Sequence, residues 1–205
     1  ALSAAGDALL IYEQNINIEG QIKMNSLLSY LYFYMGNCTM AYQYFVKGLG
    51  LLPKTADEKL KLIYLTSGVR YCICNKDIDQ ATRIIAEVSQ MAEKGNNSLW
   101  WSQVYYAQAW FYYDQKNYRK SLGYFDKTVS HARLAGDFVF SAIALTFKAT
   151  VFEKLNDHQK ALELNREALQ MRQQSGCNFL MATSYYNIAT SFIHLSSYDS
   201  AEYYI

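Results

Sequence analysis

Apolar and polar positions alternate along this chain with the spacing of helices. Apolar or small side chains recur at helical intervals, for example at Ile143, Phe147, Val151 and Leu155, and short polar turns separate such stretches. The chain has a single proline, Pro53, which suits helices because the proline ring removes a backbone donor and clashes with the preceding turn. The pattern predicts an all-α chain of about 11 helices joined by short turns.

The helical stretches belong to an internal repeat of 40 residues. A polar turn is followed by a small residue, as in Lys116-Asn117-Tyr118-Arg119-Lys120-Ser121. This small residue recurs at Ala41, Ala81, Ser121, Ala161 and Ala201. A second, mostly small column contains Ser29, Val69, Ala109, Ala149 and Ala189, and a mostly aromatic column contains Tyr32, Cys72, Tyr112, Phe152 and Phe192.

Each unit is expected to be a pair of antiparallel helices. Small residues let the helices approach closely, and each pair must stack on its neighbours to complete its core. Gly95, Gly136 and Gly176 are expected to end second helices in a left-handed conformation. The predicted organisation is one array: 1–21 is the second helix of a preceding repeat, 22–61, 62–101, 102–141 and 142–181 are full repeats, and 182–205 is a partial repeat. Because Tyr203, Tyr204 and Ile205 do not form a polar cap, we expect a fragment of a longer protein.

These columns resemble the tetratricopeptide repeat over the whole chain. Further matches are Phe45 and Phe125 in a usually aromatic column, Ala168 in a usually small column, and Pro53 in the proline column. The resemblance implies a right-handed α-solenoid. The family's basic period is about 34 residues, so the additional residues are expected to lengthen the second helix and the next first helix. Units of this length are similar to those of kinesin light chains and of bacterial regulators, in which arrays precede a GGDEF cyclase, histidine kinase or DNA-binding output domain.

In this family the first helices line a concave groove that binds a peptide or a partner. The resemblance places an aromatic set with one arginine on that face, and such residues are typical of binding hot spots. The candidate groove residues are Tyr30, Phe33, Arg70, Tyr106, Trp110, Tyr113 and Tyr186. The alternative is that these side chains pack between neighbouring helices. A carboxylate clamp of the kind found in some family members is not expected, because Arg70 alone has suitable chemistry.

Composition and motifs count against several other functions. With 19 Lys and Arg against 18 Asp and Glu, the net charge of +1 does not favour nucleic acid as a partner. No apolar run approaches the roughly 20 residues of a membrane span. No phosphate loop, nucleophile elbow or paired-histidine motif is present, so neither an enzyme nor a metal site is predicted in this segment, and no cofactor is expected. His131, His158 and His194 fall in different repeats.

The four cysteines, Cys38, Cys72, Cys74 and Cys177, are expected to be reduced, and Cys72 to be a buried, inert thiol. Reduced thiols favour the cytoplasm, with a periplasmic input domain as the alternative. The leading hypothesis is a non-enzymatic protein- or peptide-binding module, the sensory or regulatory part of a larger bacterial signalling protein such as a diguanylate cyclase. The alternative is a free-standing adaptor or scaffold that self-associates through its ends or its convex face.

Overall fold

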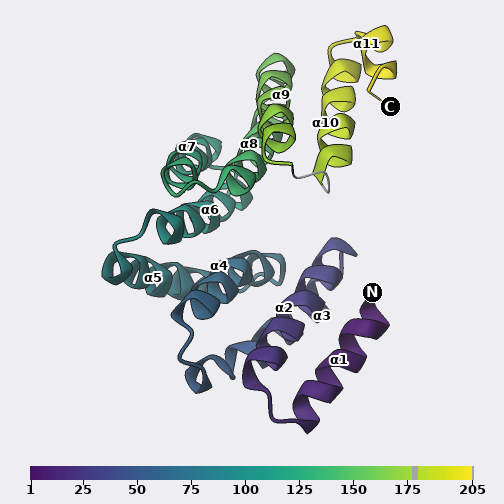
Figure 1. Cartoon of the computed structure of the whole chain (residues 1–205). Coiled ribbons are helices and arrows are strands. Elements are labelled where there is room, and N and C mark those ends of the chain that lie inside the picture. Colours follow the sequence, from purple (N-terminus) through teal and green to yellow (C-terminus); the bar gives the residue numbers. More distant parts are fainter. Residues whose placement is uncertain (177–179, 205) are drawn as a thin grey trace. The chain divides into compact units, whose positions relative to one another are not determined.

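The computed structural model describes residues 1–176 and 180–204, and these residues form helices and turns without a strand (Figure 1). The all-α prediction is confirmed. The helices are α1 (Leu2–Gln14), α2 (Ile18–Tyr34), α3 (Cys38–Leu49), the short 3₁₀ helix η1 (Leu52–Lys54), α4 (Glu58–Cys74), α5 (Ile78–Gly95), α6 (Ser98–Asp114), α7 (Tyr118–Leu134), α8 (Phe138–Lys154), α9 (His158–Gln174), α10 (Met181–His194) and α11 (Tyr198–Glu202).

The helix bounds repeat every 40 residues. The first helices α2, α4, α6 and α8 begin at Ile18, Glu58, Ser98 and Phe138, and the second helices α5, α7, α9 and α11 keep the same interval. Each of these first helices begins before the repeat start expected from the sequence, for example at Glu58 rather than Leu62. The additional residues of the long unit therefore extend the first helix at its N-terminal end.

One backbone arrangement forms almost every turn. Usually the second residue after the helix adopts a left-handed φ, and the next residue caps the following helix. Gly36 has φ +76°, and the Asn37 side chain accepts a hydrogen bond from the backbone N of Met40 at 3.0 Å. The left-handed residues are Ile16, Gly36, Lys76, Asn96, Lys116, Gly136, Asn156, Gly176 and Ser196. Gly136 and Gly176 behave as expected, but Gly95 is the last residue of α5, and Asn96 takes the left-handed conformation instead.

The predicted columns of small residues lie in the core. Ala41, Ala81, Ser121 and Ala161 have no solvent exposure, and Ala201 is 3% exposed. The second column, which contains Val69 and Ala109, is equally buried. Small side chains at these positions let the backbones of packed helices come close together, which is the role the repeat pattern predicted for them.

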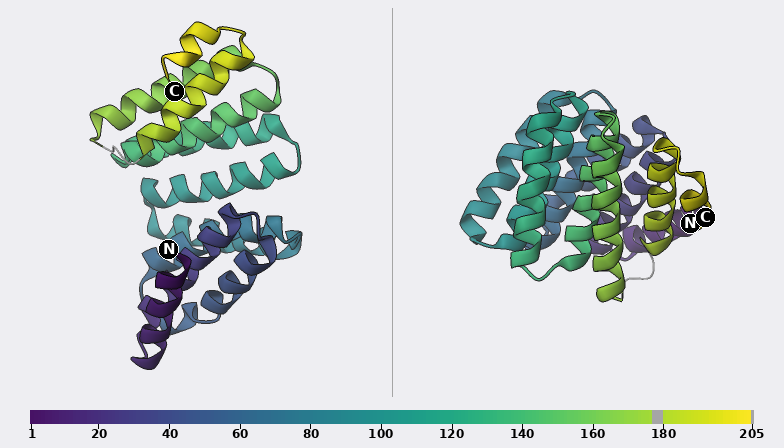
Figure 2. Two further views of the ribbon diagram at one scale, coloured as in Figure 1. Left: turned by 90° about the vertical axis from the view of Figure 1, so that its right-hand side faces the viewer. Right: turned by 90° about the horizontal axis from the view of Figure 1, so that it is seen from above.

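The chain divides into two compact units, residues 1–95 and 96–205. Within each unit every helix packs on its neighbour in sequence, so unit 1 contains α1 to α5 and unit 2 contains α6 to α11. Figure 2 shows neighbouring helices running antiparallel within each unit. The core of unit 2 centres on Phe125, Leu145 and Val151, with aromatic side chains of α6 and α8 packed around them.

Unit 1 departs from the regular repeat after α3. This helix ends at Leu49, and Pro53 is the second residue of the short helix η1. The Tyr64 hydroxyl donates to the carbonyl oxygen of Phe45 at 2.8 Å, across the backbone of Gly48. A Cβ at Gly48 would lie 2.0 Å from the Tyr64 oxygen, so glycine is required at this position, although the same column contains Val88, Thr128 and Ala168 in later repeats.

The cysteine prediction was wrong for one pair. Cys38 and Cys74 form a disulfide, with their Cα atoms 5.4 Å apart. Cys38 begins α3 and Cys74 ends α4, and the antiparallel packing of these helices brings those two ends together. Cys72 is free and fully buried, as expected. Burial raises the pKa of the Cys72 thiol to about 12, which keeps the unreactive protonated form. Cys177 lies outside the described residues.

Candidate partner-binding face

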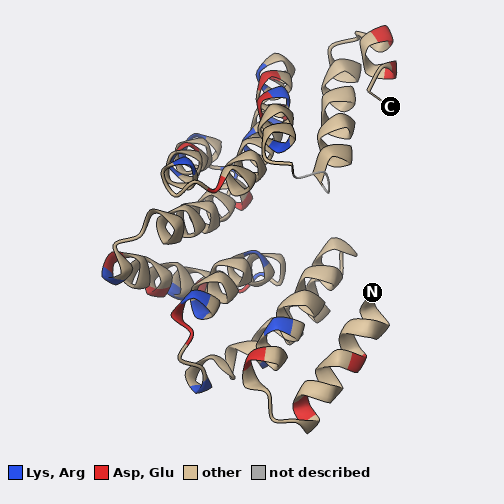
Figure 3. Cartoon of the chain, in the orientation of Figure 1, with Lys and Arg blue, Asp and Glu red and all other residues tan. Residues whose placement is uncertain are grey.

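The first-helix face is the surface formed by the first helices of each unit, α2 and α4 in unit 1 and α6, α8 and α10 in unit 2. In unit 2 two of these first helices carry few charges (Figure 3). Helix α6 contains one charged residue, Asp114, and α10 contains none among Asp, Glu, Lys and Arg, whereas α9 carries charges along its length. An aromatic face with few charges is suited to burying apolar side chains of a partner.

In unit 1 three of the predicted residues lie together. The Arg70 guanidinium on α4 is 5.0 Å from the centroid of the Phe33 ring on α2. The Phe33 ring also contacts Tyr71 at 5.7 Å. Tyr30, one helical turn before, is 44% exposed and contacts Tyr34 with ring centroids 4.5 Å apart. Burial, with Tyr34 beside it, raises the pKa of Tyr30, so this phenol stays a neutral hydrogen-bond donor.

In unit 2 the predicted residues Tyr106 and Trp110 combine packing with partial exposure. The Tyr106 ring contacts Phe140 at 5.2 Å and Phe125 at 6.1 Å. The Trp110 ring contacts Phe147 at 4.8 Å in an edge-to-face arrangement. Both side chains are half-buried. They therefore help to hold α6 against α7 and α8. Such packing between neighbouring helices was the alternative to partner binding that the sequence left open.

This packing changes how the face can be tested. Alanine at Tyr106 and Trp110 together would test the face only if the variant left the chain folded. Both rings pack against the buried Phe125, so removing them would leave a cavity in the core of unit 2. Tyr30 and Tyr186 suit the purpose better because they are 44% and 70% exposed.

Tyr113 and Glu153 lie at corresponding positions of consecutive first helices. The Tyr113 ring contacts Trp110 at 5.3 Å and Tyr118 at 5.8 Å. Burial raises the pKa of the Glu153 carboxyl, although His194, His158 and Lys154 act in the opposite direction. Burial raises the pKa of Tyr113 as well, and the charges of Tyr118 and Glu153 add to the effect. The carboxylate and the phenol are therefore within electrostatic reach of each other.

Tyr186 on α10 is separate from these groups. It makes no aromatic ring contact with another residue of the described part of the chain. The aromatic residues of unit 1 and those of unit 2 form two separate groups, each within its own unit.

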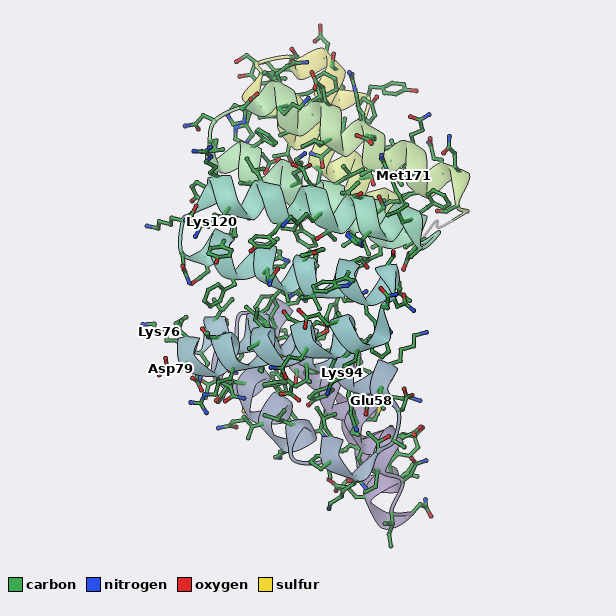
Figure 4. The ribbon with its side chains drawn as sticks, turned by 90° about the vertical axis from the view of Figure 1, so that its left-hand side faces the viewer. Glu58, Lys76, Asp79, Lys94, Lys120 and Met171 are labelled. Carbon is green, nitrogen blue, oxygen red and sulfur yellow. A yellow bond between two sulfur atoms is a disulfide. The ribbon has the colours of Figure 1, made fainter. Side chains whose placement is uncertain are left out.

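Two cavities lie on the second helices instead. One, of about 370 Å³, is lined by Arg133, Phe138, Met171, Gln174 and Ser175, at the C-terminal ends of α7 and α9. The other, of about 470 Å³, lies along α7 on the other side of Arg133. Figure 4 shows Met171 on α9 and Lys120 near the start of α7. Neither cavity includes a residue of the predicted face. Arg133 pairs with Glu167 at 2.5 Å, which fixes the guanidinium between the two hollows.

Sequence reasoning missed two features that the structure shows. The first is the capping column: Asn17, Asn37, Asp57, Asp77, Asn97, Asn117, Asp137 and Asp157 accept backbone hydrogen bonds at helix starts. Their 20-residue spacing in the sequence was the available signal. The second is the stacking of His158 and His194, whose ring centroids are 4.5 Å apart although they belong to different repeats.

No three His, Cys, Asp or Glu side chains among residues 1–176 and 180–204 are grouped so that they could hold a metal ion. None of the helices formed by these residues is long and apolar enough to cross a membrane.

Comparison with known proteins identifies the fold. Residues 102–174 match the tetratricopeptide repeat family model. Comparison with curated proteins gives no match. Among solved structures, BtubC (BKLC) from P. vanneervenii is 12% identical with a TM-score of 0.64, covering 100% of this chain and 86% of that chain.

Two further structures are similar. A signal transduction ATPase with numerous domains and a tetratricopeptide repeat sensor, PH0952 from Pyrococcus horikoshii, is 20% identical with a TM-score of 0.67, covering 91% of this chain and 28% of that chain. The apo form of RapI is 13% identical with a TM-score of 0.60, covering 98% of this chain and 56% of that chain. The fold of this chain is therefore that of the tetratricopeptide repeat solenoids, and residues 102–174 match the sequence model of that family.

Proposed function

We propose that this chain is a non-enzymatic module that binds a protein or peptide partner on its first-helix face and serves as the sensory or regulatory part of a larger signalling protein. The observation that carries the proposal is the half-exposed aromatic set on the first helices, of which α6 has one charged residue and α10 has none among Asp, Glu, Lys and Arg. Partly exposed Tyr and Trp side chains provide large contact areas at a small cost in conformational entropy, and Arg is also enriched in binding hot spots.

The similar structures support a regulatory role as an analogy. One of them is a signal transduction ATPase whose repeats are described as a sensor. At 20% identity this similarity shows a shared fold. A role in signalling is therefore proposed for this chain by analogy. A bacterial protein with a diguanylate cyclase output domain is the specific form that the 40-residue units suggested.

The proposal is tested with a random dodecapeptide library displayed on phage and selected against this chain. Selected peptides are synthesised, and their affinities are measured by calorimetry for the wild type and for Tyr30→Ala and Tyr186→Ala. Loss of an exposed hot-spot tyrosine typically costs about 2 kcal/mol, a roughly 30-fold weaker Kd. Tyr203→Ala is the matched control, because Tyr203 is 84% exposed and lies beyond the first helices.

At least one of the two first-helix variants should weaken the selected peptides, while Tyr203→Ala should not. Equal affinity for all three variants would place the peptides elsewhere and reject the first-helix face. The cavities beside Arg133 would then be examined with Phe138→Ala.

A scaffold that self-associates is the second candidate. Exposed apolar side chains at the end of unit 2 favour it: Ile193 is 46% exposed, Tyr198 65% and Tyr203 84%. Light scattering across a concentration series decides the matter, since a mass that stays at that of one chain contradicts this alternative.

A further inference from the structure

The cavity of about 370 Å³ in unit 2 contains none of the candidate groove residues. It lies where α7 and α9 end and α8 begins, so two consecutive repeats contribute to it. Its volume is at the small end of the roughly 300–1,000 Å³ that ligand sites occupy. Its described lining residues are Arg133, Phe138, Met171, Gln174 and Ser175. Such a cavity has room for a molecule of one or two rings.

The Met171 thioether is held at the wall of this cavity (Figure 4). Met171 is 9% exposed, and its sulfur accepts a hydrogen bond from Ser141 Oγ at 3.9 Å and one from Arg133 Nη2 at 3.8 Å. Ser141 is fully buried in α8, so the sulfur is held between α8 and the end of α7. A thioether in a fixed position makes a favourable contact with an aromatic ring.

Two further lining groups suit an aromatic ring. Arg133 Nη2 pairs with Glu167 Oε1 at 2.5 Å, which orients the guanidinium, yet 45% of the Arg133 side chain is exposed. Phe138 is 52% exposed, and its ring contacts no other ring in the described part of the chain. A guanidinium plane and a phenyl ring both stack with aromatic groups. Three of the five lining side chains therefore favour the same kind of ligand.

The charges around the cavity favour a neutral ligand over an anion. Arg133 is the only cation among the described lining residues, and it already pairs with Glu167. The positive end of α8 is capped by the Asp137 carboxylate, which accepts a hydrogen bond from the backbone N of Phe140 at 2.8 Å. Helices α7 and α9 both end here, and helix C-termini disfavour negative charge. An additional carboxylate would thus meet two carboxylates and two helix C-termini.

The remaining lining residues offer hydrogen-bond acceptors. The Ser175 hydroxyl donates to the carbonyl oxygen of Arg172 at 3.1 Å, so the lone pairs of the Ser175 oxygen can accept a bond from a ligand. The amide oxygen of Gln174 is a second acceptor in the lining. A ligand with one O–H or N–H group matches this arrangement.

We propose that this cavity binds a small neutral aromatic molecule of one or two rings that carries a hydroxyl or a ring N–H, the class of the phenols and indoles. The ring lies among the Arg133 guanidinium, the Phe138 ring and the Met171 sulfur, and its donor reaches Ser175 or Gln174. The inference goes beyond the proposed function and does not depend on it, since the first-helix face can bind a partner whether or not this cavity is occupied.

Phenol is the probe, and two molecules of similar size are its controls. Cyclohexanol keeps the hydroxyl but lacks the aromatic ring, and benzoate keeps the ring but carries a negative charge. Each is titrated at pH 7 into the chain labelled with ¹³C-methyl methionine, and the Met171 methyl signal, assigned with Met171→Leu, is followed by NMR. Met91 in α5 belongs to unit 1 and is the internal control.

Phenol should shift the Met171 signal but not that of Met91, with a Kd on the order of 1 mM. Phe138→Ala and Arg133→Lys should each weaken phenol about threefold, because lysine keeps the charge but lacks the guanidinium plane. Arg119→Lys, which changes an exposed arginine at the start of the same helix, is the matched control and should leave the affinity unchanged. Cyclohexanol and benzoate should bind at least about fivefold more weakly than phenol.

Three outcomes would overturn the site. The first is a Met171 signal that phenol does not shift, or shifts without saturation. The second is cyclohexanol or benzoate binding as tightly as phenol, which would remove the preference for a neutral aromatic ring. The third is an unchanged affinity in both Phe138→Ala and Arg133→Lys, which would place phenol elsewhere on the chain. Both altered side chains are largely exposed, so these variants should fold like the wild type.

Discussion

Gly68 lies inside α4, where the ring of the buried Phe45 rests against its backbone. A Cβ built on Gly68 would be 2.1 Å from Cε2 and 2.3 Å from Cζ of that ring. Phe45 is 1% exposed and is held between Tyr64 at 5.4 Å and Tyr71 at 6.1 Å. The ring would have to move by about 1 Å to accept a methyl group, and its neighbours leave it little room. Gly68→Ala should therefore destabilise unit 1.

The size of the effect follows from two opposing terms. Overpacking a core costs about 1 to 3 kcal/mol, and a contact this short belongs at the upper end. Alanine in a helix interior gains about 1 kcal/mol over glycine. We expect Gly68→Ala to lower the free energy of unfolding by about 2 kcal/mol. Gly123→Ala in α7 is the matched control, because no atom lies within 4 Å of its Cβ, and it should gain about 1 kcal/mol.

Urea unfolding followed by far-UV circular dichroism measures these differences. Because the chain has two compact units, hydrogen exchange read by mass spectrometry assigns each loss to its own unit. Phe45→Leu provides the internal check: combined with Gly68→Ala it should cost less than the sum of the two single changes, since the smaller side chain leaves space for the methyl group. A Gly68→Ala variant as stable as Gly123→Ala, or strictly additive energies, would refute the contact as described.

Three further predictions follow from the turns and cross-links. Ile16 is a β-branched residue at φ 54°, so Ile16→Gly should raise the free energy of unfolding by about 1 kcal/mol in urea, and a loss would contradict strain there. The Tyr42 hydroxyl lowers the pKa of Asp77 by donating a hydrogen bond at 2.5 Å, so stability from this bond is present above the ordinary Asp pKa and lost as pH falls. Tyr42→Phe should cost about 1 kcal/mol at neutral pH and progressively less as the pH falls through the lowered pKa of Asp77, and a pH-independent cost would exclude the carboxylate as its source. Replacing Cys38 and Cys74 by serine opens a link of 36 residues and should cost about 4 kcal/mol in urea without reductant; an unchanged stability, or free thiols at both positions by mass spectrometry, would show that the disulfide does not form.

The period and the helix pairs could be predicted from the sequence because they depend on neighbouring turns and on side-chain size. Ala41, Ala81 and Ala161 are fully buried because a close helix contact at that point of the repeat admits only a small side chain. The resemblance to the tetratricopeptide repeat and the buried state of Cys72 followed from the same columns.

The candidate face was predictable only in part. Its residues could be named from their positions in the repeat. The repeat position alone does not show whether a side chain packs against a neighbouring helix or is exposed to solvent. Trp110 and Tyr106 turn out to share the core of unit 2 with Phe125, while Tyr186, at an equivalent place on α10, is 70% exposed. That distinction depends on which side chains the adjacent first helix supplies, here Phe140 and Phe147.

The sequence by itself determined the repeat length, the turn residues, and the helix surfaces that meet, because these are set by local backbone preferences and by contacts between successive helices. Tertiary structure decided which distant side chains become partners: Cys38 with Cys74, His158 with His194, and Arg70 with Phe33. These partnerships depend on how far one helix is offset and rotated against the next. The packing of all side chains between the two helices fixes that offset, so it cannot be predicted from any single column of the repeat.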